Sequence, residues 1–265
     1  MKQWIVFGMA AWMAMPTMAQ VKQKPMKFAN NNVVAHRGAF KANGFPENSI
    51  ASLQEAIRLG CTGSEFDVRM TADDSLIINH DEHYNKLLIE ETTYTALQQF
   101  TLSNGEKLPT LREYLLTGMK ANNKTRLVLE IKPSGMGKER AVKIVDAVVA
   151  LVQSLQAEEY IVYISFDYNM MLRLKQLVPH APMQYLEGDK SPGQLKADGI
   201  MGLDYHFSVF EKHPEWIAEA KKLGLVLNAW TVNAATKMDE LMQQGFDFIT
   251  TNEPELLLKK SKQRK

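Results

Sequence analysis

Seven residues of this 265-residue chain have side chains suited to catalysis or metal binding, and they lie at or near the ends of short apolar runs. They are, in chain order, His36, Arg37, Glu65, Asp67, His80, Glu130 and Lys132. Glu65 and Asp67 are two positions apart, and so are Glu130 and Lys132. Residues two apart on a strand share one face, so each pair presents two charged groups side by side.

Neighbouring carboxylates repel each other unless a cation lies between them. Glu65, Asp67 and Glu130 together offer the oxygen ligands that Ca²⁺ or Mg²⁺ prefers, whereas zinc sites usually contain histidine or cysteine. For Glu65 and Asp67 alone, a solvated strand face is an equally good interpretation. The additional carboxylate and the two histidines favour a site for one divalent cation.

Two histidines near such a site suggest proton transfer. An imidazole has an ordinary pKa of about 6.5, so it can accept or release a proton near neutral pH.

Short β-branched or aliphatic runs alternate with helical segments along the chain. The expected strands are VVAH, SEFDVRM, SLIINH, RLVLEIK, YIVYISF, PMQYLE, LVLNAW and FDFITT. The helix in NSIASLQEAIRLG is expected to have Asn48 as its N-cap and to end at Gly60. KERAVKIVDAVVALVQSL and HPEWIAEAKKLG have the same pattern, and the basic tail is the expected end of a last helix.

This alternation predicts a parallel sheet covered by helices. About eight strands favour a (β/α)8 TIM barrel over an open doubly wound sheet. No Gly-rich dinucleotide fingerprint follows the first strand, which also weakens the doubly wound alternative. Active sites of such barrels lie at the carboxyl ends of the strands, where these polar residues fall.

Residues 1–19 have the pattern of a signal peptide. Lys2 precedes an apolar stretch of about 12 residues, short of the roughly 20 that span a bilayer, and small residues precede the expected cleavage after Ala19. We therefore expect an exported protein, periplasmic or secreted, with no integral membrane segment after cleavage. Its single TIM-barrel domain would comprise residues 20–265.

Charge and cysteine content exclude several classes of protein. The chain has 31 Lys and Arg against 30 Asp and Glu, and removal of the leader with Lys2 leaves 30 of each. This balance gives no reason to expect a nucleic-acid partner. Cys61 is the single cysteine, so an intramolecular disulfide is excluded.

An ordered series of motifs spans nearly the whole expected mature chain. It consists of HRG at 36–38, PENS at 46–49, EFD at 65–67, HD at 80–81, LPTLREYL at 108–115, LEIK at 129–132, NAWTVN at 228–233 and TTNEP at 250–254. In this order the motifs resemble those of the glycerophosphodiester phosphodiesterases. The family usually has an arginine in the run after HD, and here Asn85 takes its place. Ser49 stands where threonine is usual.

The resemblance implies a metal-dependent TIM barrel that converts small-molecule glycerophosphodiesters to glycerol 3-phosphate and an alcohol. It places the metal on Glu65, Asp67 and Glu130. It assigns phosphate contacts to Arg37 and Lys132, lining of the glycerol pocket to Trp230, and acid/base catalysis to His36 and His80. We hypothesise that His80 is the base and His36 the acid, with either the substrate's 2-hydroxyl or water as nucleophile.

Two alternatives stay open at this point. The same residues resemble lipid-headgroup phosphodiesterases of the phospholipase D or C type, and the chain could also be an exported protein that binds glycerophosphodiesters without cleaving them. The other polar residues are assigned less directly. Asp167 is expected to cap a helix, His83, His180 and His213 are expected to be structural, and in GLDYHF either Tyr205 or His206 could reach substrate.

Overall fold

The computed structural model describes Met1 and residues 27–263. The predicted cleavage site after Ala19 lies outside the described residues and stays a prediction. No helix in the described part of the chain is long and apolar enough to cross a membrane.

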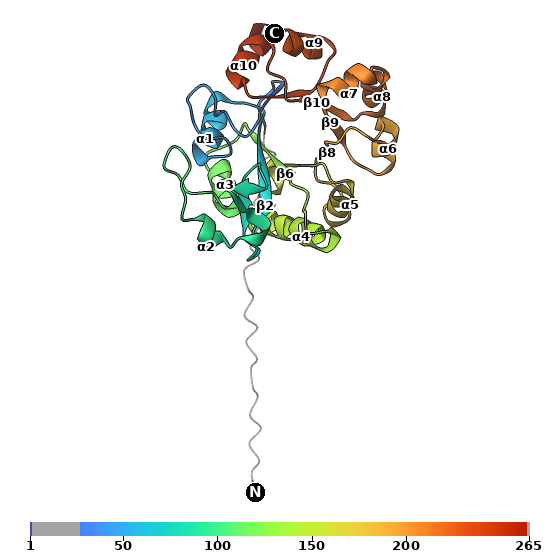
Figure 1. Cartoon of the computed structure of the whole chain (residues 1–265). Helices are drawn as coiled ribbons and strands as arrows, with labels where there is room; N and C mark the ends of the chain where they lie inside the picture. The colour runs from blue at the N-terminus through green and yellow to red at the C-terminus, as the bar shows by residue number, and fades with distance from the viewer. Residues whose placement is uncertain (2–26, 264–265) are drawn as a thin grey trace.

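Eight parallel strands close into a barrel with helices around it (Figure 1). The barrel strands are β1 (Val33–Ala35), β2 (Gly63–Met70), β6 (Arg126–Ile131), β7 (Ile161–Ser165), β8 (Met183–Tyr185), β9 (Gly202–His206), β10 (Val226–Trp230) and β11 (Phe248–Thr251). The barrel closes because β1 pairs with both β11 and β2, with Val34 opposite Thr250 on one side and Gly63 on the other. The predicted TIM barrel is therefore confirmed.

One predicted barrel strand was wrong. SLIINH forms β3 (Leu76–Ile78), which runs antiparallel to the end of β2, with Ile78 opposite Val68. The missing parallel strand is β9, which we did not include because Gly202, Asp204 and His206 depart from a β-branched pattern. His80 consequently lies in the loop after β3 and not at the end of a barrel strand.

An insertion between β2 and β6 carries this loop. It contains β3, β4 (His83–Tyr84), β5 (Leu87–Leu88), the 3₁₀ helix η1 (Ile89–Glu91) and α2 (Tyr94–Leu97). A small buried cluster of its own consists of Ile77, Ile89, Leu97 and Leu108. This core gives the loop a fixed platform beside the barrel mouth.

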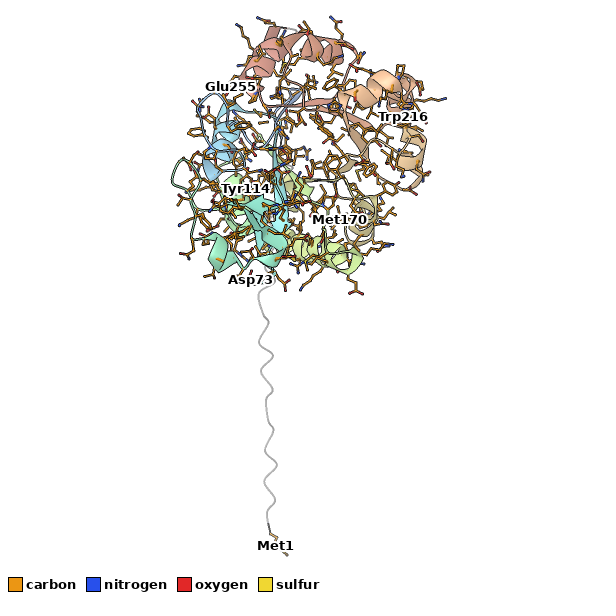
Figure 2. The ribbon with its side chains drawn as sticks, viewed as in Figure 1. Met1, Asp73, Tyr114, Met170, Trp216 and Glu255 are labelled. Carbon is orange, nitrogen blue, oxygen red and sulfur yellow. The ribbon has the colours of Figure 1, made fainter. Side chains whose placement is uncertain are left out.

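The other helices cover the outside of the barrel. They are α1 (Ile50–Leu59), α3 (Leu111–Met119), α4 (Lys138–Ser154), η2 (Glu158–Tyr160), α5 (Tyr168–Leu177), α6 (Pro192–Ala197), α7 (Phe207–Lys212), α8 (Glu215–Leu223), α9 (Ala235–Gln243) and α10 (Pro254–Gln263). Figure 2 labels Tyr114, Met170 and Trp216 in this layer, and Tyr114 packs on Phe66 of β2 with ring centroids 4.5 Å apart.

The ends of the helices match the sequence signals with one exception. Gly60 ends α1 in a left-handed conformation, as predicted, and Asp167 caps α5 by accepting hydrogen bonds from two backbone N–H groups. The N-cap of α1 is Ser49 and not Asn48, because the Ser49 hydroxyl accepts from the N–H of Ser52. This leaves the Asn48 side chain free for a partner inside the barrel.

Candidate active site

A cavity of about 110 Å³ opens at the carboxyl end of the barrel. Its lining includes all but one of the site residues predicted from sequence, together with several new ones: His36, Arg37, Glu65, His80, Glu130, Lys132, Ile164, Phe166, Leu186, Asp204, Trp230, Thr231 and Thr250. The exception, Asp67, is fully buried and contacts Lys132 beside the cavity.

The three predicted metal ligands converge because β2 and β6 are neighbours in the barrel. Asp67 lies directly opposite Glu130 in the parallel register, and Glu65 shares the inward face of β2. One carboxylate oxygen from each of the three lies within 4.8 Å of the other two. Glu65 Oε1 is buried with no hydrogen-bond partner among the described residues. Three converging oxygens, one of them unpartnered, fit a hard divalent cation.

Lys132 neutralises part of this cluster. Its Nζ lies 2.8 Å from Asp67 Oδ1 and 2.7 Å from Glu130 Oε1. Burial opposes the charge on Asp67, but the Lys132 ammonium outweighs it and lowers the Asp67 pKa to about 2. Burial and the Asp67 charge raise the pKa of Glu130 to about 7, and burial with its acidic neighbours raises the pKa of Glu65 well above its usual value.

These raised pKa values predict that the metal-free protein loses stability as pH rises. Glu65 and Glu130 keep protons in the folded state above pH 4.3, where unfolded carboxyls have released them, so each of them lowers the free energy of unfolding as pH rises toward about 7. His36, whose pKa is lowered to about 4, has the opposite effect up to about pH 6.5 and offsets one of the two carboxyls, so the net free energy of unfolding still falls. We expect scanning calorimetry to show the Tm of the metal-free protein about 5–10 °C lower at pH 8 than at pH 5. Glu130→Gln should flatten this slope, and a Tm that rises over the interval would contradict the expectation.

The HRG segment forms a tight turn over the N-terminus of α1. Arg37 and Gly38 both have positive φ angles, 53° and 80°. A Cβ at Gly38 would lie 2.4 Å from Ser52 Oγ, so only glycine allows this approach. The turn directs the Arg37 N–H to Glu65 Oε2 at 2.7 Å, and the Arg37 guanidinium pairs with Glu47 at 2.8 Å. The turn therefore ties the HRG motif to the carboxylate cluster.

His36 is half-buried, with its side chain 19% exposed, and is paired with a neutral group. Its Nδ1 lies 2.7 Å from Asn252 Oδ1, and its Nε2 lies 3.9 Å from Glu65 Oε2. An amide oxygen at this position accepts a hydrogen bond from Nδ1–H, so Nε2 carries the free lone pair in the cavity. Burial and then the Arg37 charge lower the pKa of His36 to about 4. The ring is therefore neutral at neutral pH.

His80 has a different environment at the open side of the cavity. Its side chain is 33% exposed, and its Nδ1 lies 2.7 Å from Asp81 Oδ1. The buried Arg69 directs Nε and Nη2 to the His80 backbone carbonyl, at 3.0 and 2.8 Å. Asp81 orients the His80 ring, and Arg69 fixes the loop that carries it.

Comparison with known proteins identifies this arrangement. The model of the glycerophosphoryl diester phosphodiesterase family matches residues 36–256. The chain belongs to this family. A glycerophosphodiester phosphodiesterase from Caldanaerobacter subterraneus is 30% identical over 247 residues, which cover 85% of this chain and 96% of that protein. Like it, the chain is a phosphoric diester hydrolase.

Solved structures agree with this assignment. A glycerophosphodiester phosphodiesterase from Parabacteroides distasonis superposes with a TM-score of 0.86 at 40% identity, covering 90% of this chain and 99% of that one. A phosphodiesterase from Oleispira antarctica, solved with the product sn-glycerol 3-phosphate, has a TM-score of 0.74 at 24% identity and covers 88% of this chain and 96% of its own. The second similarity concerns the fold alone.

Sequence reasoning missed several residues that support this phosphodiesterase site. Asn48 donates from Nδ2 to Asp67 Oδ2 at 2.7 Å and accepts from the Asp67 N–H at 3.2 Å. Asn252 orients His36, and Arg69 holds the His80 loop. Asn48 and Asn252 lie within the PENS and TTNEP motifs, so their place in the series was a usable signal. No pattern in the sequence pointed to Arg69.

From β9, Asp204 lines the cavity. Tyr205 and His206, the two residues expected to reach substrate, are not among the lining residues. Tyr205 points outward, and its hydroxyl donates to the Lys190 carbonyl at 2.8 Å. His206 caps α7 and packs edge-to-face on Trp230, with ring centroids 5.2 Å apart. The Trp230 indole N–H donates to the Asp204 carbonyl at 2.8 Å, which places this predicted pocket residue beside Asp204.

The remaining polar residues discussed above lie away from the cavity. His213 stacks on Trp216 with ring centroids 4.3 Å apart, as expected for a structural histidine. His83 belongs to β4, and neither it nor His180 is among the lining residues. Asn85 has a φ of 48° in the turn between β4 and β5 and is not among the lining residues.

Proposed function

We propose that this phosphodiesterase hydrolyses glycerophosphodiesters to glycerol 3-phosphate and an alcohol, and that it requires one divalent cation, Ca²⁺ or Mg²⁺. The observation that carries the proposal is the single cavity in which the buried acidic cluster meets both histidines. The product complex of the Oleispira antarctica relative supports glycerol 3-phosphate as the product.

Glu65, Asp67 and Glu130 would hold the cation, which supplies positive charge for the non-bridging phosphate oxygens. Lys132 and Arg37 would add to it from the protein. Both lie against the acidic cluster, since Lys132 Nζ contacts Asp67 and Glu130, and Arg37 Nε lies 3.8 Å from Asp67 Oδ2. A phosphate here would therefore meet two cationic side chains from the two sides of β2, Lys132 directly after β6 and Arg37 in the turn after β1.

The partners of the two histidines favour the reverse of the roles expected from sequence. His36, held neutral against an amide oxygen with Nε2 free, suits the base that deprotonates the nucleophile. His80, beside the Asp81 carboxylate at the exposed rim, suits the acid that protonates the leaving alkoxide. The alcohol would then leave directly toward solvent.

Either the glycerol 2-hydroxyl or water could be the nucleophile that His36 activates. The first route forms a cyclic glycerol phosphate, so a cyclic species that builds up during slow turnover would support it. Oxygen-18 incorporated into glycerol 3-phosphate in a single turnover, with no cyclic species at any time, would support direct attack by water.

Product analysis separates this proposal from action on lipid headgroups. We expect ³¹P NMR to show glycerol 3-phosphate released from glycerophosphocholine and glycerophosphoethanolamine. Phosphocholine as product, or hydrolysis of lysophospholipids alone, would instead support the phospholipase alternatives. Binding of these compounds without any cleavage would support a binding protein.

We also propose that the mature enzyme acts outside the cytoplasm, on the basis of the pattern of residues 1–19. Mass spectrometry of the protein recovered from the cell envelope should give an N-terminus at Gln20. An intact N-terminus in the cytoplasmic fraction would contradict export.

A further inference from the structure

The cavity has two chemically different arcs. His36, Arg37 and the carboxylate cluster come from β1, β2 and β6, which are adjacent in the barrel. The rest of the circumference, from β7 to β11, contributes the apolar side chains Ile164, Phe166, Leu186 and Trp230, with Thr250 from β11. Asp204 is the single carboxyl among the lining residues of this second arc.

Asp204 lacks a partner for one of its oxygens. The residue is 1% exposed, and Asp204 Oδ1 has no hydrogen-bond partner among the described residues. The Asp204 carbonyl accepts a hydrogen bond from the Trp230 indole N–H at 2.8 Å, which holds the residue in place. A buried polar atom without a partner is costly, and in a cavity the natural partner is a ligand.

This combination fits a small polyol. Carbon atoms of the ligand would contact the apolar walls, while one hydroxyl would meet Asp204. The other alcohol of the substrate need not occupy this arc. The headgroup end also has an exit at the exposed His80 side.

Building on the proposed function, we infer that Asp204 binds the terminal hydroxyl of the glycerol moiety and selects glycerol over alcohols that lack this group. The phosphate would lie on the charged arc and the glycerol carbon chain would extend across the cavity toward β9. Asp204 would thus be a specificity residue for one half of the substrate, leaving the other alcohol free to vary.

The test compares glycerophosphoethanolamine with its analogue lacking the terminal hydroxyl, which keeps the 2-hydroxyl. The kcat/KM of the wild type should be about 10–100-fold higher for the natural substrate than for the analogue. In Asp204→Ala this ratio should fall to less than about 3-fold, because kcat/KM should decrease for the natural substrate alone. Equal loss on both substrates would overturn the inference. Asp204→Asn, which keeps size and polarity, should retain part of the preference and serves if the alanine variant does not fold.

Gln184→Ala is a matched control. Gln184 is also buried in the barrel with an unpartnered side-chain oxygen, but it lines a separate small cavity at the other end of the barrel. Its substitution should leave the preference unchanged. If the wild type cleaves neither compound, the proposed function fails. The role of Asp204 is then decided by calorimetry, which compares the affinity for glycerol 3-phosphate with the affinity for its analogue lacking the terminal hydroxyl.

Discussion

The His80→Ala variant is expected to lose about 10²–10⁴-fold of kcat on glycerophosphocholine and to recover most of this loss on glycerol 3-(p-nitrophenyl phosphate). Choline is a poor leaving group without a proton, whereas p-nitrophenolate leaves unprotonated. Rescue by the activated ester is therefore specific to loss of the general acid. Single-turnover rates with both substrates make the comparison.

The His36→Ala variant should lose activity on both substrates, because the nucleophile still needs its base. His213→Ala is the control, since His213 lies outside the cavity and stacks on Trp216. If the activated ester rescued His36→Ala and left His80→Ala impaired, the roles would be those first expected from sequence. Rescue of neither variant would contradict proton donation to the leaving group by either histidine.

The second large effect concerns the acidic cluster. Glu65→Gln should weaken binding of Ca²⁺ or Mg²⁺ by more than about 100-fold, because it removes the charge of the residue whose Oε1 has no other partner. Isothermal titration calorimetry of the metal-stripped protein measures this directly. Activity on glycerophosphocholine should fall with it at moderate metal concentration and return partly at high concentration.

Glu55→Gln is the matched control for this substitution. Glu55 is also a buried glutamate, but it lies on α1 and pairs with Arg58 at 2.6 Å, away from the cavity. It should leave metal affinity unchanged. Unaltered metal affinity in Glu65→Gln would instead show that the cation binds elsewhere.

The sequence was sufficient to predict the barrel and most of the site because chemistry and strand pattern coincide there. Glu65, Asp67 and Glu130 alternate within strongly apolar strands, so both their identity and their shared face were readable. Strand β9 was missed because Gly202, Asp204 and His206 leave it without the β-branched or aliphatic run that marks the other strands. SLIINH was predicted as a barrel strand because the antiparallel strand that it forms beside β2 has the same apolar pattern.

The sequence alone could not predict which groups contact the two histidines. His36 is next to Asn252 only because β1 and β11 close the barrel, a contact across 216 positions. Arg69 reaches the His80 carbonyl because the insertion folds back over β2. The different partners of the two histidines follow from these contacts, so the roles first expected from the sequence were open to exchange.

Release of glycerol 3-phosphate by the metal-stripped mature protein, before and after Ca²⁺ or Mg²⁺ is restored, tests the central claim most directly. We expect negligible release from glycerophosphocholine without metal, full release once a cation is added, and no restoration in Glu65→Gln at the same concentration. Undiminished release from the folded, metal-stripped protein, or equal restoration in Glu65→Gln, would contradict a cation-dependent phosphodiesterase centred on this acidic cluster.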